Sequence, residues 1–162
     1  MKYKILFFLI SLSFFFNACA SQPYLKENSA FIVFKTTTQK YADMGFIYKN
    51  NSEVKLEVYS SGQALVTLKV TDNLVCMSTL ACVSKENFNK DVLATTYPKD
   101  ILDNIFRGKP IFAGTNMKKV FNGFTQKVVK HNIYNINYSV LNGNTIFVDN
   151  INNIVIKVKN NI

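Results

Sequence analysis

The chain has 162 residues, of which 48% are hydrophobic and 14% aromatic, and a formal net charge of +9. That length suits one domain with a buried core, and the basic balance points to nucleic acid, an anionic membrane surface or acidic proteins as partners. The export signal described next argues against nucleic acid. The lysines are scattered, apart from Lys118-Lys119 and Lys127/Lys130, so we expect most of them to be solvated.

The first 18 residues have the layout of a secretory signal peptide. Lys2 and Lys4 precede an apolar run over residues 5–16, and Ala18 supplies a small residue at its end. Twelve helical residues span about 18 Å, which is too short for a hydrocarbon core of ~30 Å. Loss of this segment and its two lysines leaves 144 residues with 17 cations, 10 acids and a net charge of +7.

Cys19 follows the predicted cleavage point directly. The segment 16–19 resembles a bacterial lipoprotein box, in which the cysteine receives a diacylglycerol and becomes the mature N-terminus. Phe16 and Asn17 depart from the usual pattern, and an ordinary signal with a nearby cysteine is the alternative. We predict lipid attachment at Cys19, with these covalent acyl groups and no further cofactor. A polar tether over 19–29 and one domain over 30–162 are expected to follow.

From Ala30 onward the apolar residues recur with period two, which indicates strands. Val54, Leu56 and Val58 share one face. A second run places Ala64, Val66, Leu68 and Val70 on one face, and residues 60–62 (Ser-Ser-Gly) between the runs have turn chemistry. The predicted strands of this half are 31–34, 46–48, 54–58, 64–70 and 74–77.

The pattern then changes to a helical one. Residues 85–93 are helical at best, because two asparagines lower their helix propensity. Residues 96–108 predict a better helix, with Pro98 near its first turn and Gly108 at its end, while Pro110 prevents continuation. Strands return at 134–140, 145–148 and 154–158, with a turn at 142–144. The fold class is therefore α+β, mainly an antiparallel sheet with helices on one side.

Cys76 and Cys82 remain as a pair if Cys19 carries lipid. In an oxidising compartment we expect a disulfide, which would stabilise the fold by about 2 kcal/mol. A redox pair or a metal site is the alternative, although a metal needs more ligands than the single histidine, His131, can add.

The sequence offers no set of catalytic residues, so we predict a non-enzymatic protein. His131 is best explained as a surface residue. Asp100 and Asp103 lie three apart in the predicted helix, where capping and solvation are sufficient roles. There is no Gly-rich phosphate loop, nucleophile elbow or metal spacing.

Three parts of the chain resemble the LolA/LolB-like lipoprotein-localisation family. They are a strand, Gly-containing turn and returning strand over 45–68, a Pro-started helix ending in Gly-x-Pro over 97–110, and the last strands over 133–138 and 151–162. The resemblance implies an incomplete, curved β-barrel with helices covering its concave face. It also implies a cavity for the acyl chains of lipoproteins, which a soluble periplasmic carrier delivers to a monomeric receptor.

The chain also departs from that family. An exposed leucine before the glycine of the protruding loop is replaced by Ser61, beside Gly62. Family tryptophans are absent, with Tyr48 and Phe106 at two of their positions, and the pair of cysteines is not a hallmark. With Ala20 after Cys19, we expect anchoring in the outer membrane of a Gram-negative bacterium, facing the periplasm.

Two functions remain open. The first is an acyl-binding lipoprotein for reception of lipoproteins or lipids. The second is an accessory subunit of an envelope complex whose interior is filled by side chains. For the first we expect twelve residues to line the cavity: Val54, Leu56, Val58, Val66, Leu68, Ile101, Leu102, Ile105, Phe106, Tyr134, Ile136 and Tyr138.

Overall fold

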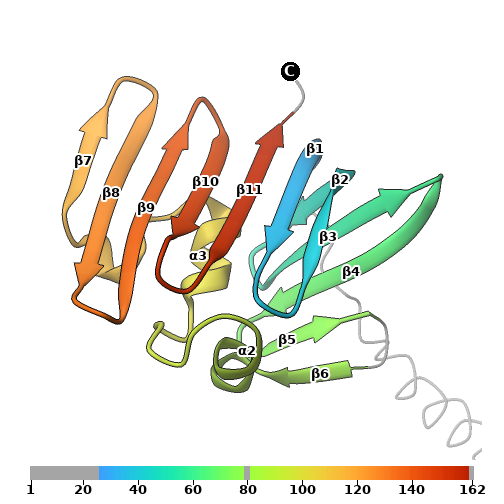
Figure 1. Ribbon diagram of the computed structural model, residues 1–162. Coiled ribbons are helices and arrows are strands. Elements are labelled where there is room, and N and C mark those ends of the chain that lie inside the picture. The colour runs from blue at the N-terminus through green and yellow to red at the C-terminus, as the bar shows by residue number, and fades with distance from the viewer. Residues whose placement is uncertain (1–25, 79–80, 161–162) are drawn as a thin grey trace, which may run out of the picture.

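The computed structural model describes residues 26–78 and 81–160, and it places them on one mainly antiparallel sheet with two α-helices (Figure 1). The sheet has eleven strands in the order β6-β5-β4-β3-β2-β1-β11-β10-β9-β8-β7. The strands are β1 Lys26–Lys35, β2 Lys40–Lys49, β3 Glu53–Ser60, β4 Gln63–Thr71, β5 Leu74–Met77, β6 Ala81–Ser84, β7 Met117–Val120, β8 Gly123–Lys130, β9 Tyr134–Leu141, β10 Asn144–Asp149 and β11 Ile154–Asn160.

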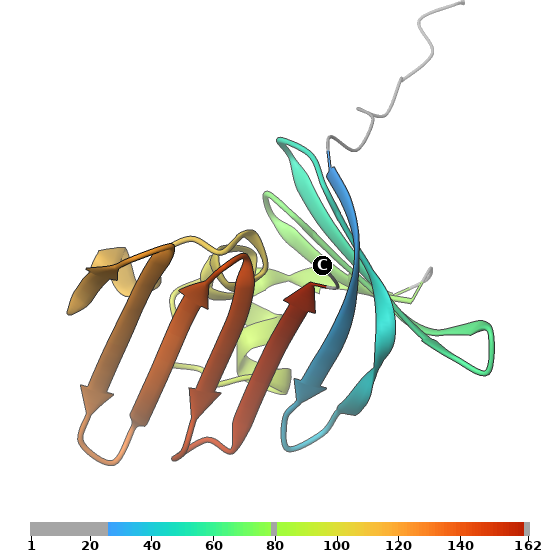
Figure 2. The same ribbon diagram turned by 90° about the horizontal axis from the view of Figure 1, so that it is seen from above.

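The two halves of the chain meet where β1 pairs with β11. Ile32 lies opposite Val158 and Phe34 opposite Ile156, so apolar side chains from both halves face the same side. All the remaining pairs in the sheet are also antiparallel, and each joins two strands that are consecutive in sequence. The end strands β6 and β7 do not pair with each other, so the sheet stays open. Figure 2 shows that it is strongly curved.

Gly45 marks a close approach within the curved half of the sheet. It is buried on β2, and a Cβ at this position would lie 2.0 Å from the backbone oxygen of Glu57 on β3. A glycine inside a strand permits such backbone proximity. Residue 45 is therefore a place where the curvature depends on the absence of a side chain.

The helices lie between β6 and β7 in sequence. In α2, Lys85–Val92, the Ser84 side chain caps the first turn by accepting from the Asn87 amide. In α3, Ile101–Arg107, Gly108 ends the helix in the left-handed conformation, and a 3-10 turn, η2 (Phe112–Gly114), follows. Helix α3 contacts β3, β4 and β10, and it lies behind β10 and β11 in Figure 1.

Several sequence predictions are confirmed. The expected strands are present, a helix ends at Gly108, and Cys76 and Cys82 form a disulfide across β5 and β6. The open, mainly antiparallel sheet agrees with the expected fold class. Within the described residues, no helix is long and apolar enough to span a bilayer. Cys19 and the signal segment 1–18 lie outside the residues that the structure describes.

Other predictions need correction. Strand β1 begins at Lys26, so residues 26–29 are not tether but pair with β2. Three strands, β6, β7 and β8, were not predicted, and α3 begins at Ile101 rather than at residue 96. Ala64 leaves the face of Val66, because a bulge at Val58/Tyr59 shifts the register and pairs Ala64 with Tyr59.

Candidate acyl-binding site

The structure brings the twelve predicted lining residues to one side of the sheet. Ten of them belong to the buried core, and Val66 and Tyr134 pack against it while partly exposed. Within α3, Ile101, Leu102, Ile105 and Phe106 are all at most 1% exposed. The predicted set therefore forms one continuous apolar cluster between α3 and the sheet.

Side chains fill most of the apolar space on this face. A depression on the inner side of β1–β5 has a volume of only about 10 Å³, whereas sites for drug-sized ligands measure roughly 300–1,000 Å³. Four predicted residues line it, Leu56, Val58, Val66 and Leu68. Four that the sequence did not single out complete it, namely Ile32, Phe34, Tyr41 and Met77. An acyl chain does not fit into this depression unless the surrounding side chains move.

Polar contacts hold α3 against one half of the sheet. Arg107, in the last turn of α3, donates to the backbone oxygen of Asn50 in the β2–β3 turn over 2.8 Å, and its Nε pairs with Asp103 at the same distance. At the other end, the buried Lys85 of α2 pairs with Asp100 over 2.8 Å. These contacts tie both ends of α3 to neighbouring elements.

A buried carboxylate ties the segment before α3 to the other half of the sheet. Tyr97 donates to Asp149 over 2.5 Å, and Asp149 also accepts from the amides of Asn135 and Ile151 and from the Asn152 side chain. Burial alone would raise the pKa of Asp149, but these hydrogen bonds outweigh it and hold the pKa below its ordinary value. Burial and the carboxylate raise the pKa of Tyr97.

Gln126 and Tyr138 secure the segment that follows α3. The buried Gln126 side chain accepts from the Ile111 amide over 2.9 Å and donates to the carbonyls of Ile111 and Thr115. The Tyr138 hydroxyl donates to the Lys109 carbonyl over 3.0 Å, and burial raises its pKa. The sequence did not point to Gln126, although a glutamine among the inward positions of a strand signals a partner for its amide.

Ser61 and Gly62 form the exposed tip of the β3–β4 hairpin. Both have positive φ, 52° and 79°, as in a two-residue type I′ turn. Leu65, beside this tip, is 58% exposed. The hairpin therefore presents a leucine to solvent, although Ser61 occupies the loop position itself.

The two positions of the family tryptophans differ in environment. Phe106 is 1% exposed in the core, whereas Tyr48 lies partly buried on the outer side, where its hydroxyl donates to Glu57 over 3.2 Å. Burial and the Glu57 charge raise the pKa of Tyr48 to about 12. Only Phe106 therefore belongs to the predicted cavity.

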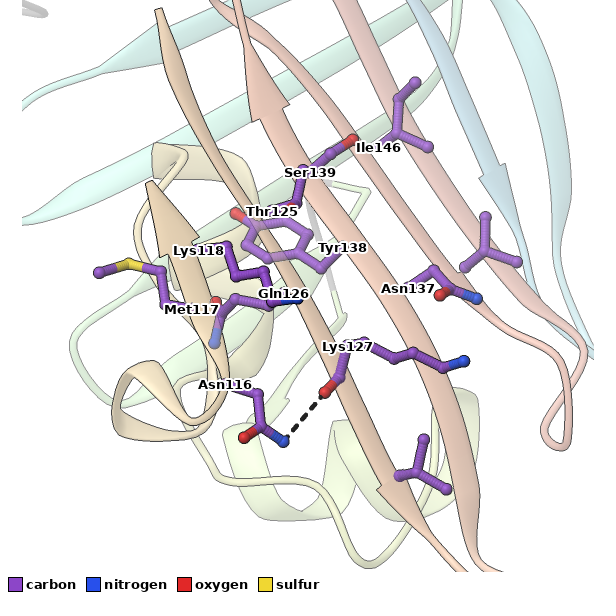
Figure 3. A pocket seen from close by; sticks show the side chains of 12 residues that line it. Asn116, Met117, Lys118, Thr125, Gln126, Lys127, Asn137, Tyr138, Ser139 and Ile146 are labelled. Atoms are coloured by element: carbon purple, nitrogen blue, oxygen red, sulfur yellow. Dashed lines mark hydrogen bonds between the residues drawn. The ribbon is translucent and has the colours of Figure 1, made fainter. Parts of the chain in front are cut away.

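A larger groove of about 760 Å³ lies over β7–β10 (Figure 3). Lys118, Lys127 and amide side chains contribute to it together with apolar residues such as Val129 and Ile146. The groove is open and mixed in polarity, so it does not suit a bare acyl chain.

Nowhere in the ranges 26–78 and 81–160 do three His, Cys, Asp or Glu side chains gather in a way that could hold a metal ion. His131 is exposed in the β8–β9 turn. No family model matches this chain. No curated protein matches it either.

Proposed function

We propose that this chain is a lipid-anchored protein of the bacterial envelope that receives the acyl chains of lipoproteins or lipids on the inner face of its sheet. In this proposal the open sheet is a half-barrel and the helices are its cover. The observation that carries it is the depression on β1–β5, because seven of its eight lining side chains are apolar and the eighth is that of Tyr41. The resemblance to the LolA/LolB-like family supports the same function.

The energetics favour binding in an enclosed site. A chain of about 15 methylenes gains roughly 12 kcal/mol when it leaves water for apolar surroundings. That gain can offset displacement of the side chains around the depression and the loss of a few hydrogen bonds, each of which contributes about 1 kcal/mol. Transfer of cargo would then run directly from site to site or from site to membrane.

Entry requires the depression to widen by movement of its own lining side chains on β1–β5, since no α3 residue lines it. Helix α3 would stay in place, because Tyr97 and Asp149 hold the segment before it and Tyr138 holds the Lys109 carbonyl after it. Val66 and Met77, at the edge of the depression, are the side chains that an entering chain would meet.

Uptake of a fluorescent fatty acid and of an acylated lipopeptide tests this function. The described residues form one sheet with one core, so a chain starting at Ala20 and exported without lipid keeps all of these elements. We expect saturable uptake that Val66→Phe reduces at least tenfold, because the larger ring fills the depression. Ile146→Phe, on the outer groove, is the matched control and leaves uptake unchanged. Absence of uptake by the unmodified chain contradicts the function.

The small volume of the depression favours the second candidate, an accessory lipoprotein whose filled interior only supports its outer surface. Crosslinking in the envelope separates the two. One stable protein partner, unaffected by Val66→Phe, is expected of the accessory subunit. Diverse acylated proteins, lost in Val66→Phe, are expected of the receptor.

A further inference from the structure

The charges of this chain are distributed unequally between its two halves. Residues 1–103 carry eleven Lys and Arg against nine acids, whereas residues 104–162 carry eight against one. That single acid, Asp149, is 1% exposed and bonded within the protein. The half of the sheet from β7 to β11 thus offers lysines to solvent with no exposed carboxylate among its described residues. Such a surface suits an anionic partner.

One turn in this half exposes apolar side chains beside lysines. Phe121, at the β7–β8 turn, is 91% exposed, and its neighbour Val120 is 46% exposed. Lys118 and Lys119, immediately before them, are also exposed. A large aromatic ring next to cations is the combination that binds at a membrane surface, where the ring enters the headgroup region and the cations contact anionic lipids.

The start of β1 lies at the same edge of the sheet. Gly123, at the start of β8, pairs with Leu141, at the end of β9. Ala30, near the start of β1, pairs with Asn160, at the end of β11. In Figure 1 the β7–β8 and β9–β10 turns, the end of β11 and the start of β1 all lie at the upper edge. From β1 to β8 the sheet advances by four strands, or about 19 Å at ~4.8 Å each.

We propose that this edge rests on an anionic lipid bilayer, with the Phe121 ring inserted among the headgroups and Lys118 and Lys119 against anionic lipids. The occupant is argued from charge complementarity and from the chain that precedes β1. Cys19, the predicted lipid site, lies seven residues before Lys26, within about 25 Å of extended chain. One membrane surface can therefore hold both the anchor and Phe121. The inference does not depend on acyl binding inside the sheet.

Tryptophan fluorescence tests the proposal on the intact mature protein. The chain contains no tryptophan, so Phe121→Trp introduces a single reporter at an exposed site that does not disturb the core. Val129→Trp is the matched control. Val129 is 56% exposed and lies near the end of β8, the strand that starts just after Phe121. Each variant is reconstituted with vesicles of phosphatidylethanolamine and phosphatidylglycerol that carry brominated acyl chains, and with phosphatidylcholine vesicles.

We expect blue-shifted emission and bromolipid quenching for Phe121→Trp in the anionic vesicles, and neither for Val129→Trp. Changing Lys118 or Lys119 to Gln in the Phe121→Trp background should lower the insertion equilibrium about fivefold each, since one cation near an anionic membrane has about that effect. Equal quenching of both reporters would mean that the outer face lies flat and would overturn the edge orientation. A blue shift without quenching would indicate that the Phe121→Trp ring is buried against protein. Emission that is neither blue-shifted nor quenched would exclude contact with the bilayer. Either result overturns the proposal.

Discussion

Tyr97 and Asp149, which lie 52 residues apart in sequence, share a buried hydrogen bond of 2.5 Å. Tyr97 precedes α3 and Asp149 ends β10, so the bond joins the helical segment to the last hairpin of the sheet. The same carboxylate accepts from the backbone amides of Asn135 and Ile151. One acidic side chain therefore organises three segments.

Tyr97→Phe should lower the free energy of unfolding by about 2 kcal/mol, because it removes a buried hydrogen bond to a charged acceptor. Urea denaturation of the chain from Ala20 measures the change. Tyr41→Phe is the control, since the Tyr41 hydroxyl donates to the nearby Gln39 and Tyr41 is partly exposed. Equal losses in the two variants would contradict a special role for Tyr97.

The stability should also depend on pH through Asp149. Its pKa is lower in the folded protein than in the unfolded chain, where it is about 3.9. This stabilisation is complete above about pH 4 and is lost as the pH falls through the folded-state pKa. Asp149→Asn should therefore be less stable than the unmodified chain near neutral pH, and the gap should narrow in acid. A constant gap between neutral and acidic urea titrations would exclude this explanation.

Gly108→Ala should destabilise the protein by about 2 kcal/mol. Gly108 has φ +67°, and an added Cβ would meet Val140 Cγ1 at 3.3 Å, so both the backbone conformation and the packing oppose a side chain. Gly62→Ala is the matched control, because Gly62 has φ +79° but open space around it. It should cost about 1 kcal/mol. Thermal or urea unfolding of both variants measures the difference, and an equal cost would mean that Val140 gives way freely.

Reduction of the Cys76–Cys82 disulfide should lower the free energy of unfolding by about 2 kcal/mol, because the bond closes only a short loop. The comparison is urea denaturation with and without a reductant. A Cys76→Ala/Cys82→Ala variant is the control, and its stability should not respond to the reductant. A chain that unfolds in reductant alone would show that the β5–β6 hairpin stabilises far more of the fold.

Local patterns in the sequence predicted much of this fold. Alternating apolar residues marked the strands around Leu56 and Ile136, and Pro98 with Gly108 marked the helix that became α3. These features depend on near neighbours along the chain, so they are readable without a structure. The same patterns concealed β7 and β8. In β7 two lysines occupy a four-residue strand, and in β8 the inward Gln126 interrupts the apolar alternation.

By itself the sequence predicted eight of the eleven strands, the helix that ends at Gly108, most of the apolar faces and a disulfide between the two later cysteines. Only the tertiary structure decided that β1 lies beside β11, that side chains fill the inner face, and that scattered lysines gather on a half of the sheet without exposed acids. The reason is physical. Alternation and helix ends arise from contacts between residues close in sequence, whereas sheet order arises from long-range pairing. An inward Leu56 or Ile136 can pack equally well against neighbouring side chains or against an acyl chain, so only the space left in the tertiary structure distinguishes a filled interior from an open one.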